Sequence, residues 1–372
     1  MNSAEVLSHW RKAVSSAMSF LTKPQALVLA AFSLGVSLQR SCALHRVAEG
    51  LFWLGKPDTV ERRLQRWLNN RKFRWKRGCQ DLSRWIFTCL GKLPGPYVLL
   101  VDEVPLQEHL KVMVVALAYQ GRALPLAWWA YPQEAMPLGQ VKLINTLLSW
   151  VAKALPEGAQ VLVQADRGIG TSPALIRALE KRHWYFLFRV QGGVRLHLQD
   201  GREVEFARVL QKQGQKWGQP LRAFKGAGWL PCRALAWWGR GFKEPWLLVT
   251  NCPQAQADDY GYRMWEELAF RDLKSGGFQW HKSKVRDPEH ANRLWLVLAL
   301  AYAWVVSLGE LVLEDAQRWQ EITRGLLEHR RHHDSIFSLG LRYLDRWFHL
   351  GRELLYGLHL KQVVLLSKSV VP

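Results

Sequence analysis

The sequence is poor in cysteine, and its cysteines are not paired. The five of them are spread along the chain without any Cys-x-x-Cys spacing: Cys42, Cys79, Cys89, Cys232 and Cys252. An odd and scattered set excludes a disulfide framework and a zinc ribbon. It suits a reducing compartment, and we therefore expect a cytoplasmic location.

Long apolar segments are also missing. The longest uncharged apolar run extends from Leu294 to Gly309, which is shorter than the roughly 20 residues of a membrane span. Because this run contains two tryptophans and a tyrosine, we expect a buried core helix and no contact with a membrane. No charged segment followed by a long apolar one stands near the N-terminus, so we also expect no signal peptide.

Acidic residues are the third deficit. The 372 residues include 31 Asp and Glu but 51 Lys and Arg, so the formal net charge is +20. Since 49% of the residues are apolar, the chain can bury a large core, and intrinsic disorder is excluded. A folded protein with this excess of positive charge is expected to bind a polyanion, of which nucleic acid is the commonest.

The first 95 residues have a helical pattern. One helix is predicted to begin at Asp58, with Glu61 three residues later as its capping partner. Its apolar side chains recur at helical spacing and define one buried face: Val60, Leu64, Trp67 and Leu68. We therefore predict a helical region over residues 1–95, which ends at a cluster of Gly and Pro residues.

A basic stretch begins within this helix. Residues 62–77 contain eight basic residues and no acidic one, and Arg62, Arg63 and Arg66 lie off the apolar face. This pattern favours a DNA-contacting helix whose cations bind phosphates. Aromatic residues are interleaved with the cations: Trp67, Phe73 and Trp75. The alternative is a solvated helix face on a protein that is basic everywhere.

Residues 96–190 combine buried strands with helices. Short apolar runs predict strands at residues 97–101, 111–119, 124–129, 161–163 and 184–190. The second and third strands flank a turn and form a hairpin. Ser172 and Pro173 mark the start of a helix between the last two strands. This order predicts an α/β core with a mixed sheet.

The rest of the chain divides into three parts. Residues 191–250 alternate short apolar pieces with Gly-rich turns and contain five tryptophans, which predicts a β-rich insertion. Helical structure returns near Asp258. Residues 251–315 are therefore expected to resume the α/β core, and residues 316–372 to form a helical C-terminal region.

Two aspartates follow buried apolar runs. Asp102 and Asp166 each come at the carboxyl end of a predicted strand, where open α/β sheets bind their ligands. On neighbouring strands, the two carboxylates would suit a hard cation such as Mg²⁺. Each aspartate alone is a weak signal, because such residues are also common turn and cap formers.

A set of polar residues recurs at helical spacing after the insertion. Steps of three or four residues place them on one face of a predicted helix: Tyr260, Arg263, Glu267, Arg271 and Lys274. The apolar residues between them are expected to pack on the other side: Met264, Trp265, Leu268 and Leu273. In the functional interpretation, Glu267 completes a carboxylate cluster and the cations hold phosphates. The alternative is a surface helix with ion pairs along its face.

Together these residues resemble the DDE transposases of bacterial insertion sequences. Asp102, Asp166 and the spacing Tyr260-x2-Arg263-x3-Glu267-x6-Lys274 are similar to the branch with the Y-R-E-K signature, the insertion-sequence "four" family. Further similarity lies in residues 62–68, 166–168, 270–274 and 335–342.

The resemblance implies an RNase H-like mixed sheet with helices on both faces, interrupted by the β-rich insertion. It also implies that Asp102, Asp166 and Glu267 bind two Mg²⁺ ions, for which Mn²⁺ can substitute. Glu266 precedes Glu267, but adjacent helix residues point about 100° apart, and the spacing to Lys274 favours Glu267. Tyr260 and the cations of the same face, Arg263, Arg271 and Lys274, would hold DNA phosphates.

The implied activity is cut-and-paste transposition. The enzyme would cleave DNA at the ends of the element, through a hairpin intermediate, and transfer the freed end into target DNA. Trp237 or Trp238 would stack a flipped base, although either one could equally be a packing residue of the insertion. The expected partners are the terminal inverted repeats, the target DNA and a second copy of the chain in a homodimer. The expected location is the bacterial cytoplasm, at the nucleoid.

Two other functions stay open from the sequence. An RNase H-like nuclease that cuts DNA without strand transfer would carry the same three acidic residues. A domesticated DNA-binding protein without activity is a further alternative, against which the intact acidic set argues.

Overall fold

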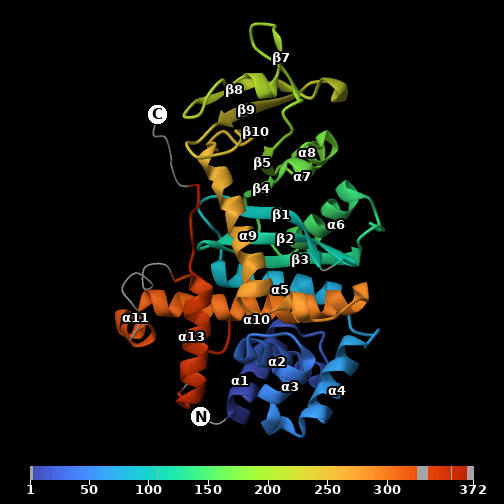
Figure 1. Ribbon diagram of the computed structural model, residues 1–372, viewed down its shortest axis with the longest axis vertical. Coiled ribbons are helices and arrows are strands. Elements are labelled where there is room, and N and C mark those ends of the chain that lie inside the picture. Colours follow the sequence, from blue (N-terminus) through green and yellow to red (C-terminus); the bar gives the residue numbers. More distant parts are fainter. Residues whose placement is uncertain (1–2, 107, 325–333, 353, 367–372) are drawn as a thin grey trace.

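Five apolar segments form the central strands in the computed structural model (Figure 1), which describes residues 3–106, 108–324, 334–352 and 354–366. The strands are β1 (Tyr97–Leu106), β2 (Leu110–Tyr119), β3 (Arg122–Pro132), β4 (Val161–Ala165) and β5 (Tyr185–Arg189). Their order in the sheet is β3-β2-β1-β4-β5. β1, β4 and β5 run parallel, while β2 is antiparallel to both of its neighbours. This is the expected RNase H-like mixed sheet, and the predicted hairpin of β2 and β3 is confirmed.

The insertion continues the same sheet. It contains β6 (Arg195–His197), β7 (Glu203–Glu205), β8 (Lys216–Ala223), β9 (Leu230–Trp237) and β10 (Trp246–Thr250), so its β-rich character is confirmed. β10 pairs with β5 in antiparallel orientation, and the sheet therefore has ten strands. The insertion is thus hydrogen-bonded to the core. Alternation of apolar residues predicts strands but does not say which strands pair.

Helices pack on both faces of the sheet. α6 (Gln140–Ala152) contacts β2 and β3, and α8 (Pro173–Glu180) contacts β5. The predicted start of α8 is confirmed, because the Ser172 hydroxyl accepts a hydrogen bond from the backbone N–H of Leu175. A short helix, α7 (Arg167–Gly170), follows β4 directly.

Helices of the N-terminal region form most of the lower end of the molecule in Figure 1, and the last of them lies higher, beneath the sheet. They are α1 (Ser3–Ala17), α2 (Lys23–Gln39), α3 (Leu44–Gly50), α4 (Pro57–Leu68) and α5 (Trp75–Leu90). The apolar face predicted for α4 is buried. The predicted cap was wrong, because the N-cap is Lys56 and Asp58 lies in the first turn without a capping hydrogen bond. Pro57 begins the helix instead, since its fixed φ is already helical.

The apolar run from Leu294 to Gly309 lies in α10 (Pro288–Glu314), which passes through the protein interior. The whole helix α10 is long and apolar enough to cross a membrane, but 94% of its most apolar 18-residue stretch is buried inside the protein. It packs on α2, α5, α13 and β3, and the expected core helix is confirmed. Near its start, Asn292 Oδ1 accepts a hydrogen bond from the Ala130 backbone N–H at 2.7 Å. This bond gives a partner to one backbone N–H group on the unpaired edge of β3.

Two glycines allow α10 to cross α13 (Ile336–His349) at backbone contact. A Cβ added to Gly340 would lie 1.8 Å from the carbonyl oxygen of Val305, and one added to Gly309 would lie 1.9 Å from that of Ile336. No side chain fits at either position. The short helix α11 (Ala316–Thr323) lies between α10 and α13 in sequence. After α13, residues 354–366 run along the surface of the molecule without regular secondary structure (Figure 1).

Candidate active site

Asp102 and Asp166 lie side by side on neighbouring strands. The pairing of β1 with β4 ends with Val101 opposite Ala165, so the next residue on each chain is an aspartate. Residues in register on parallel strands point to the same face of the sheet. The two carboxylates are close enough that Asp166 raises the pKa of Asp102.

The structure corrects one detail of Asp102. This residue does not end its strand, because β1 stays paired with β2 as far as Leu106. The apolar run stops at Val101, but the backbone hydrogen bonds continue beyond it. The residues before and after Asp102 are therefore both paired with β2, which fixes the backbone of Asp102.

Asp166 has a structural role as well as its predicted role in the site. Its Oδ1 accepts hydrogen bonds from the backbone N–H groups of Gly168 at 3.0 Å and Ile169 at 3.2 Å. It is thus the N-cap of α7, and these bonds fix the carboxylate at the end of β4.

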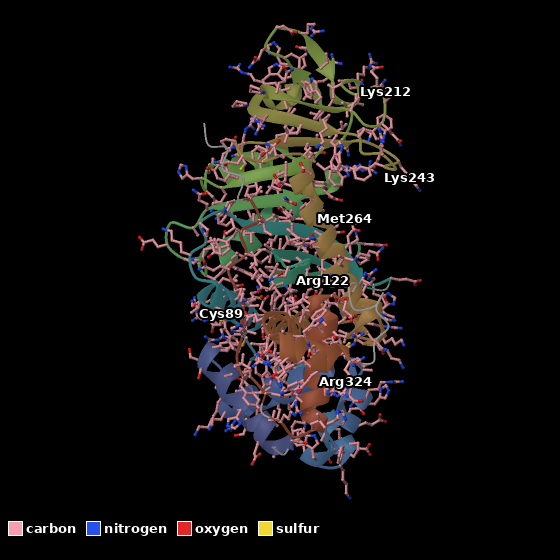
Figure 2. All side chains as sticks on the ribbon, turned by 90° about the vertical axis from the view of Figure 1, so that its left-hand side faces the viewer. Cys89, Arg122, Lys212, Lys243, Met264 and Arg324 are labelled. Carbon is pink, nitrogen blue, oxygen red and sulfur yellow. The ribbon has the colours of Figure 1, made fainter. Side chains whose placement is uncertain are left out.

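The helix after the insertion, α9 (Arg263–Arg271), turns a charged face toward the sheet. It packs on β1, β2 and β3, and its buried residues are Arg263, Glu266, Ala269 and Phe270. The expected apolar side was therefore wrong. Met264 is 50% exposed (Figure 2), Trp265 and Leu268 are half-buried, and of the four predicted residues Leu273 alone is buried. The reason is that the ion pair of Arg263 with Asp102 on β1 orients the helix.

Arg263 is the centre of these ion pairs. Its Nη2 lies 2.9 Å from Asp102 Oδ2. Its Nη1 lies 3.6 Å from Glu266 Oε2 and 3.8 Å from Glu267 Oε1. Burial alone would lower the pKa of Arg263, but Glu266 and Asp102 raise it above its usual value. One guanidinium therefore holds carboxylates from β1 and α9 together.

The two adjacent glutamates have different environments. The Glu266 side chain is fully buried, and neither of its oxygens accepts a hydrogen bond from a described residue. Burial and then Asp102 raise the pKa of Glu266 well above its usual value, although Arg263 lowers it. The Glu267 side chain is 58% exposed and still acts on the pKa of Asp102. Both glutamates thus border the aspartates, Glu266 from inside the protein and Glu267 from the surface.

The pKa of Asp102 gives a testable pH dependence. Burial, Asp166 and Glu267 raise this pKa while Arg263 and the backbone of Glu103 lower it, and the net result is a pKa of about 6. Below that pH, protons therefore compete with a metal ion for this carboxylate. If Asp102 binds a metal ion, metal-dependent DNA cleavage should fall about tenfold for each pH unit below its apparent pKa. We expect this in a pH profile of single-turnover cleavage.

A metal titration provides the control for this profile. Because metal ions and protons compete for the same carboxylate, a higher Mg²⁺ concentration should move the fall to lower pH. A fall that stays at the same pH would mean that the titrating group is not a metal ligand.

A π-helical turn, Asp272–Gly276, continues α9. Asp272 is buried and accepts hydrogen bonds from Arg122 Nε at 2.6 Å and from the Tyr302 hydroxyl at 3.1 Å. These bonds tie the turn to β3 and α10. Lys274 is half-buried, and its pKa is lowered by burial and raised by Asp102. Lys274 therefore lies within electrostatic reach of Asp102, while Arg271 is exposed.

Tyr260 connects the site with the aromatic side chains of the insertion. It is buried, and burial raises its pKa, with smaller effects from Arg263, Arg189, Asp166 and Asp102. Its ring meets that of Trp246 edge-on, with centroids 5.2 Å apart. Trp246 in turn meets Trp237 at 5.3 Å. The Trp238 indole donates a hydrogen bond to the carbonyl of Phe242 at 3.0 Å. Both candidate stacking residues are half-buried, and the ring of Trp237 belongs to this aromatic cluster.

In the basic stretch of the N-terminal region, the cations lie at the surface and the aromatic side chains lie inside. Arg62 and Arg66 are exposed and Arg63 is half-buried. The interleaved aromatic residues all lie in the core: Trp67, Phe73 and Trp75. These three rings are therefore not available to stack on DNA bases. α4 lies at the end of the molecule opposite the insertion (Figure 1), so DNA contacts at Arg62, Arg63 and Arg66 would be far along the body from the aspartates.

The donor set suits a hard divalent cation. Carboxylate oxygens are the ligands that Mg²⁺ and Mn²⁺ prefer, and two buried carboxylate oxygens of Glu266 lack hydrogen-bond donors among the described residues. Within that part of the chain, however, no three His, Cys, Asp or Glu side chains are close enough to hold one ion. The Arg263 guanidinium lies among the carboxylates instead.

Two residues near the aspartates were not found from the sequence. Arg189 ends β5, and the β4–β5 pairing places it in the same row as Asp102 and Asp166. Arg189 lies at the end of a buried strand, as the two aspartates were predicted to do, so the same criterion could have identified it. Trp246 begins β10 and contacts Tyr260, a long-range contact for which the sequence contains no signal.

Part of the chain matches a known protein family. Residues 139–304 match the family model described as the transposase DDE domain. This range includes Asp166 and Glu267 and begins after Asp102. No curated protein matches the chain.

Proposed function

We propose that this chain is a DDE transposase that cuts DNA at the ends of an insertion sequence and joins the freed ends to target DNA, and the match of residues 139–304 to the transposase DDE domain supports this proposal. The observation that carries this proposal is the arrangement around Arg263. Asp102 and Asp166 come from adjacent parallel strands, and the glutamates of α9 face them across one guanidinium. The branch with the Y-R-E-K signature is part of the proposal.

Asp102, Asp166 and Glu267 are the residues that would hold two Mg²⁺ ions, with Mn²⁺ as a substitute. Bound divalent ions activate the attacking oxygen and stabilise the leaving oxygen in phosphoryl transfer. Asp166 is already oriented by two backbone N–H groups, which reduces the entropy lost when it takes up a ligand. Asp102 is fixed within a paired strand.

Cations and Tyr260 would position the DNA strand. Arg263 is held at the centre of the site and can form two parallel hydrogen bonds to a phosphate. Lys274 would act as a point charge near the scissile phosphate, and its location within reach of Asp102 supports this role. Arg271 is exposed beside it and would contact the flanking backbone.

The reaction would proceed in four steps at phosphorus. Water attacks the phosphodiester at the end of the element, its bond to the 3′ oxygen of the element breaks, and a 3′-hydroxyl on the element and a 5′-phosphate on the flank result. That hydroxyl attacks the opposite strand to form a hairpin, and the 3′ oxygen of the flanking DNA leaves. A second water opens the hairpin and restores the 3′-hydroxyl, which then attacks a phosphate of the target DNA and displaces a target 3′ oxygen. Trp237 or Trp238 would stack the base that flips out at the hairpin.

The partners follow from the same proposal. Double-stranded DNA would contact Arg62, Arg63 and Arg66 as well as the site, and the net charge of +20 favours this binding. Two copies of the chain would bring the two ends of the element together as a homodimer. The proposed location is the bacterial cytoplasm, at the nucleoid.

The test uses a labelled duplex that carries the terminal repeat of the element next to flanking DNA. With Mg²⁺, wild-type protein should cut at the repeat end and give a hairpin or a strand-transfer product on a denaturing gel. Glu267→Ala should give neither product. Cutting that ignores the repeat would replace the proposal with a nuclease. Binding without cutting in Mg²⁺ and in Mn²⁺ would replace it with an inactive DNA-binding protein.

A further inference from the structure

Glu244 holds two arginines at the margin of the site. It lies in the loop between β9 and β10, and its carboxylate accepts hydrogen bonds from Arg167 Nη1 at 3.0 and 3.1 Å. It accepts another from Arg189 Nη2 at 2.6 Å. Arg167 directly follows Asp166, and Arg189 stands in the same row of the sheet. Two cations next to the aspartates are thus bound to one acidic side chain.

This arrangement has the chemistry of a phosphate site. Arginine is the residue best suited to bind phosphate oxygens through paired N–H groups, and a carboxylate presents its oxygens in a similar way. The side chains of Glu244 and Arg167 are 50% and 55% exposed. The Arg189 side chain is 20% exposed. Another anion can therefore reach Arg167 directly from solvent, and reaches Arg189 when it replaces the glutamate.

We propose that Arg167 and Arg189 bind a backbone phosphate of the DNA strand that enters the active site, and that Glu244 occupies this phosphate site in the free protein. The inference rests on the proposed function, because it takes DNA as the ligand. It adds two residues that do not belong to the polar face of α9. DNA binding would exchange the Glu244 carboxylate for a phosphate.

Release of Glu244 would also change the charge of its loop. The loop, residues 238–245, contains Arg240 and Lys243 and no other acidic residue. Both cations are exposed, and Figure 2 shows Lys243 above Met264 of α9. Once a phosphate pairs with Arg167 and Arg189, the loop keeps its cations close to the same strand.

The loop does not depend on Glu244 for its shape. The carbonyl of Phe242 accepts hydrogen bonds from Gln213 Nε2 at 2.9 Å and from Trp238 Nε1 at 3.0 Å. The Phe242 ring also packs between Trp237 and Trp246. A variant without the Glu244 charge should therefore fold normally, since exposed ion pairs contribute little to stability.

The alternative is that Glu244 merely anchors the loop. The two explanations give opposite signs for DNA affinity. If Glu244 competes with DNA, its neutralisation strengthens binding. If it positions a DNA-binding loop, its neutralisation weakens binding.

The experiment measures the dissociation constant of the full chain for a fluorescently labelled duplex, with EDTA present, over a series of NaCl concentrations. Glu244→Gln should bind about three- to tenfold more tightly than wild type, which corresponds to the loss of two competing exposed ion pairs. The matched control is Glu203→Gln. Glu203 pairs with Lys225 at 2.7 Å and Arg195 at 4.0 Å, also in the insertion, so its replacement changes the net charge equally. The control should bind less than twofold more tightly, as expected for a generic charge effect.

A second pair of variants checks the arginines. Replacing Arg167 and Arg189 together by Gln should reduce the slope of log affinity against log salt by about one. In that background, Glu244→Gln should have no more effect than Glu203→Gln. Equal effects of the two single variants, weaker binding by Glu244→Gln, or an unchanged salt slope would each overturn the phosphate site.

These outcomes are distinct from failure of the proposed function. The measurement needs neither cleavage nor a terminal repeat, so normal DNA binding with no Glu244 effect would overturn the phosphate site alone. Wild-type protein that does not bind the duplex at low salt would contradict DNA as the ligand and would overturn both proposals.

Discussion

Replacing Glu267 with Gln is expected to slow DNA cleavage by at least about a thousandfold, because a lost metal ligand removes several kcal/mol of charge stabilisation from the transition state. Replacing Glu266 with Gln is expected to cost less than about tenfold. Gln keeps the shape of the buried side chain and removes a charge that burial already disfavours. Single-turnover cleavage of a duplex with the terminal repeat measures both effects.

The pair of variants is informative because the structure places the two glutamates so differently. Glu266 is enclosed by protein, whereas the Glu267 side chain is 58% exposed, on the side from which DNA would arrive in the proposed function. Thermal melting and DNA binding serve as controls for folding. If Glu266→Gln abolished cleavage and Glu267→Gln preserved it, the third acidic role would belong to Glu266, and the spacing to Lys274 would be misleading.

Gly340→Ala should destabilise the protein by about 3 kcal/mol or more, which is in the range of severe overpacking. The added Cβ would lie 1.8 Å from a carbonyl oxygen of α10. Backbone cannot move aside as a flexible side chain can, so α10 and α13 would have to separate. The change would reduce the contact of α13 with the most buried helix of the chain. Urea unfolding followed by circular dichroism measures the free energy difference.

The control for this variant is Gly193→Ala. A Cβ at Gly193 meets no atom within 4 Å, so its stability should stay within about 0.5 kcal/mol of wild type. Similar losses at both positions would show that helix crossing does not depend on the close approach at Gly340.

Local patterns were sufficient to predict much of the fold. The continuous apolar runs predicted β1, β4 and β5, because strands buried on both faces need apolar residues at every position. The turn at residues 120–122 predicted the hairpin of β2 and β3, and Ser172 with Pro173 predicted the start of α8. Each of these signals is confined to a few neighbouring residues. The start of α4 was missed because Pro57 and Asp58 are both common at helix starts.

Long-range contacts were beyond such patterns. The orientation of α9 depends on Arg263 reaching Asp102, which is 161 positions earlier in the sequence. The prediction from the spacing of apolar residues therefore placed the wrong side of the helix in the interior. The pairing of β10 with β5 and the ion pair of Arg122 with Asp272 are equally remote along the chain. The convergence of Asp102 with Asp166 was predictable, because parallel neighbours bring their carboxyl ends together.

The pairing of β10 with β5 has a consequence for any attempt to shorten the chain. Without residues 191–250, β5 would present an unpaired backbone edge with Phe186, Leu187 and Phe188 at its centre. Flat apolar edges recruit strands from other molecules and cause aggregation. The insertion therefore covers this edge, and a shortened version of the chain would need a new cover for it.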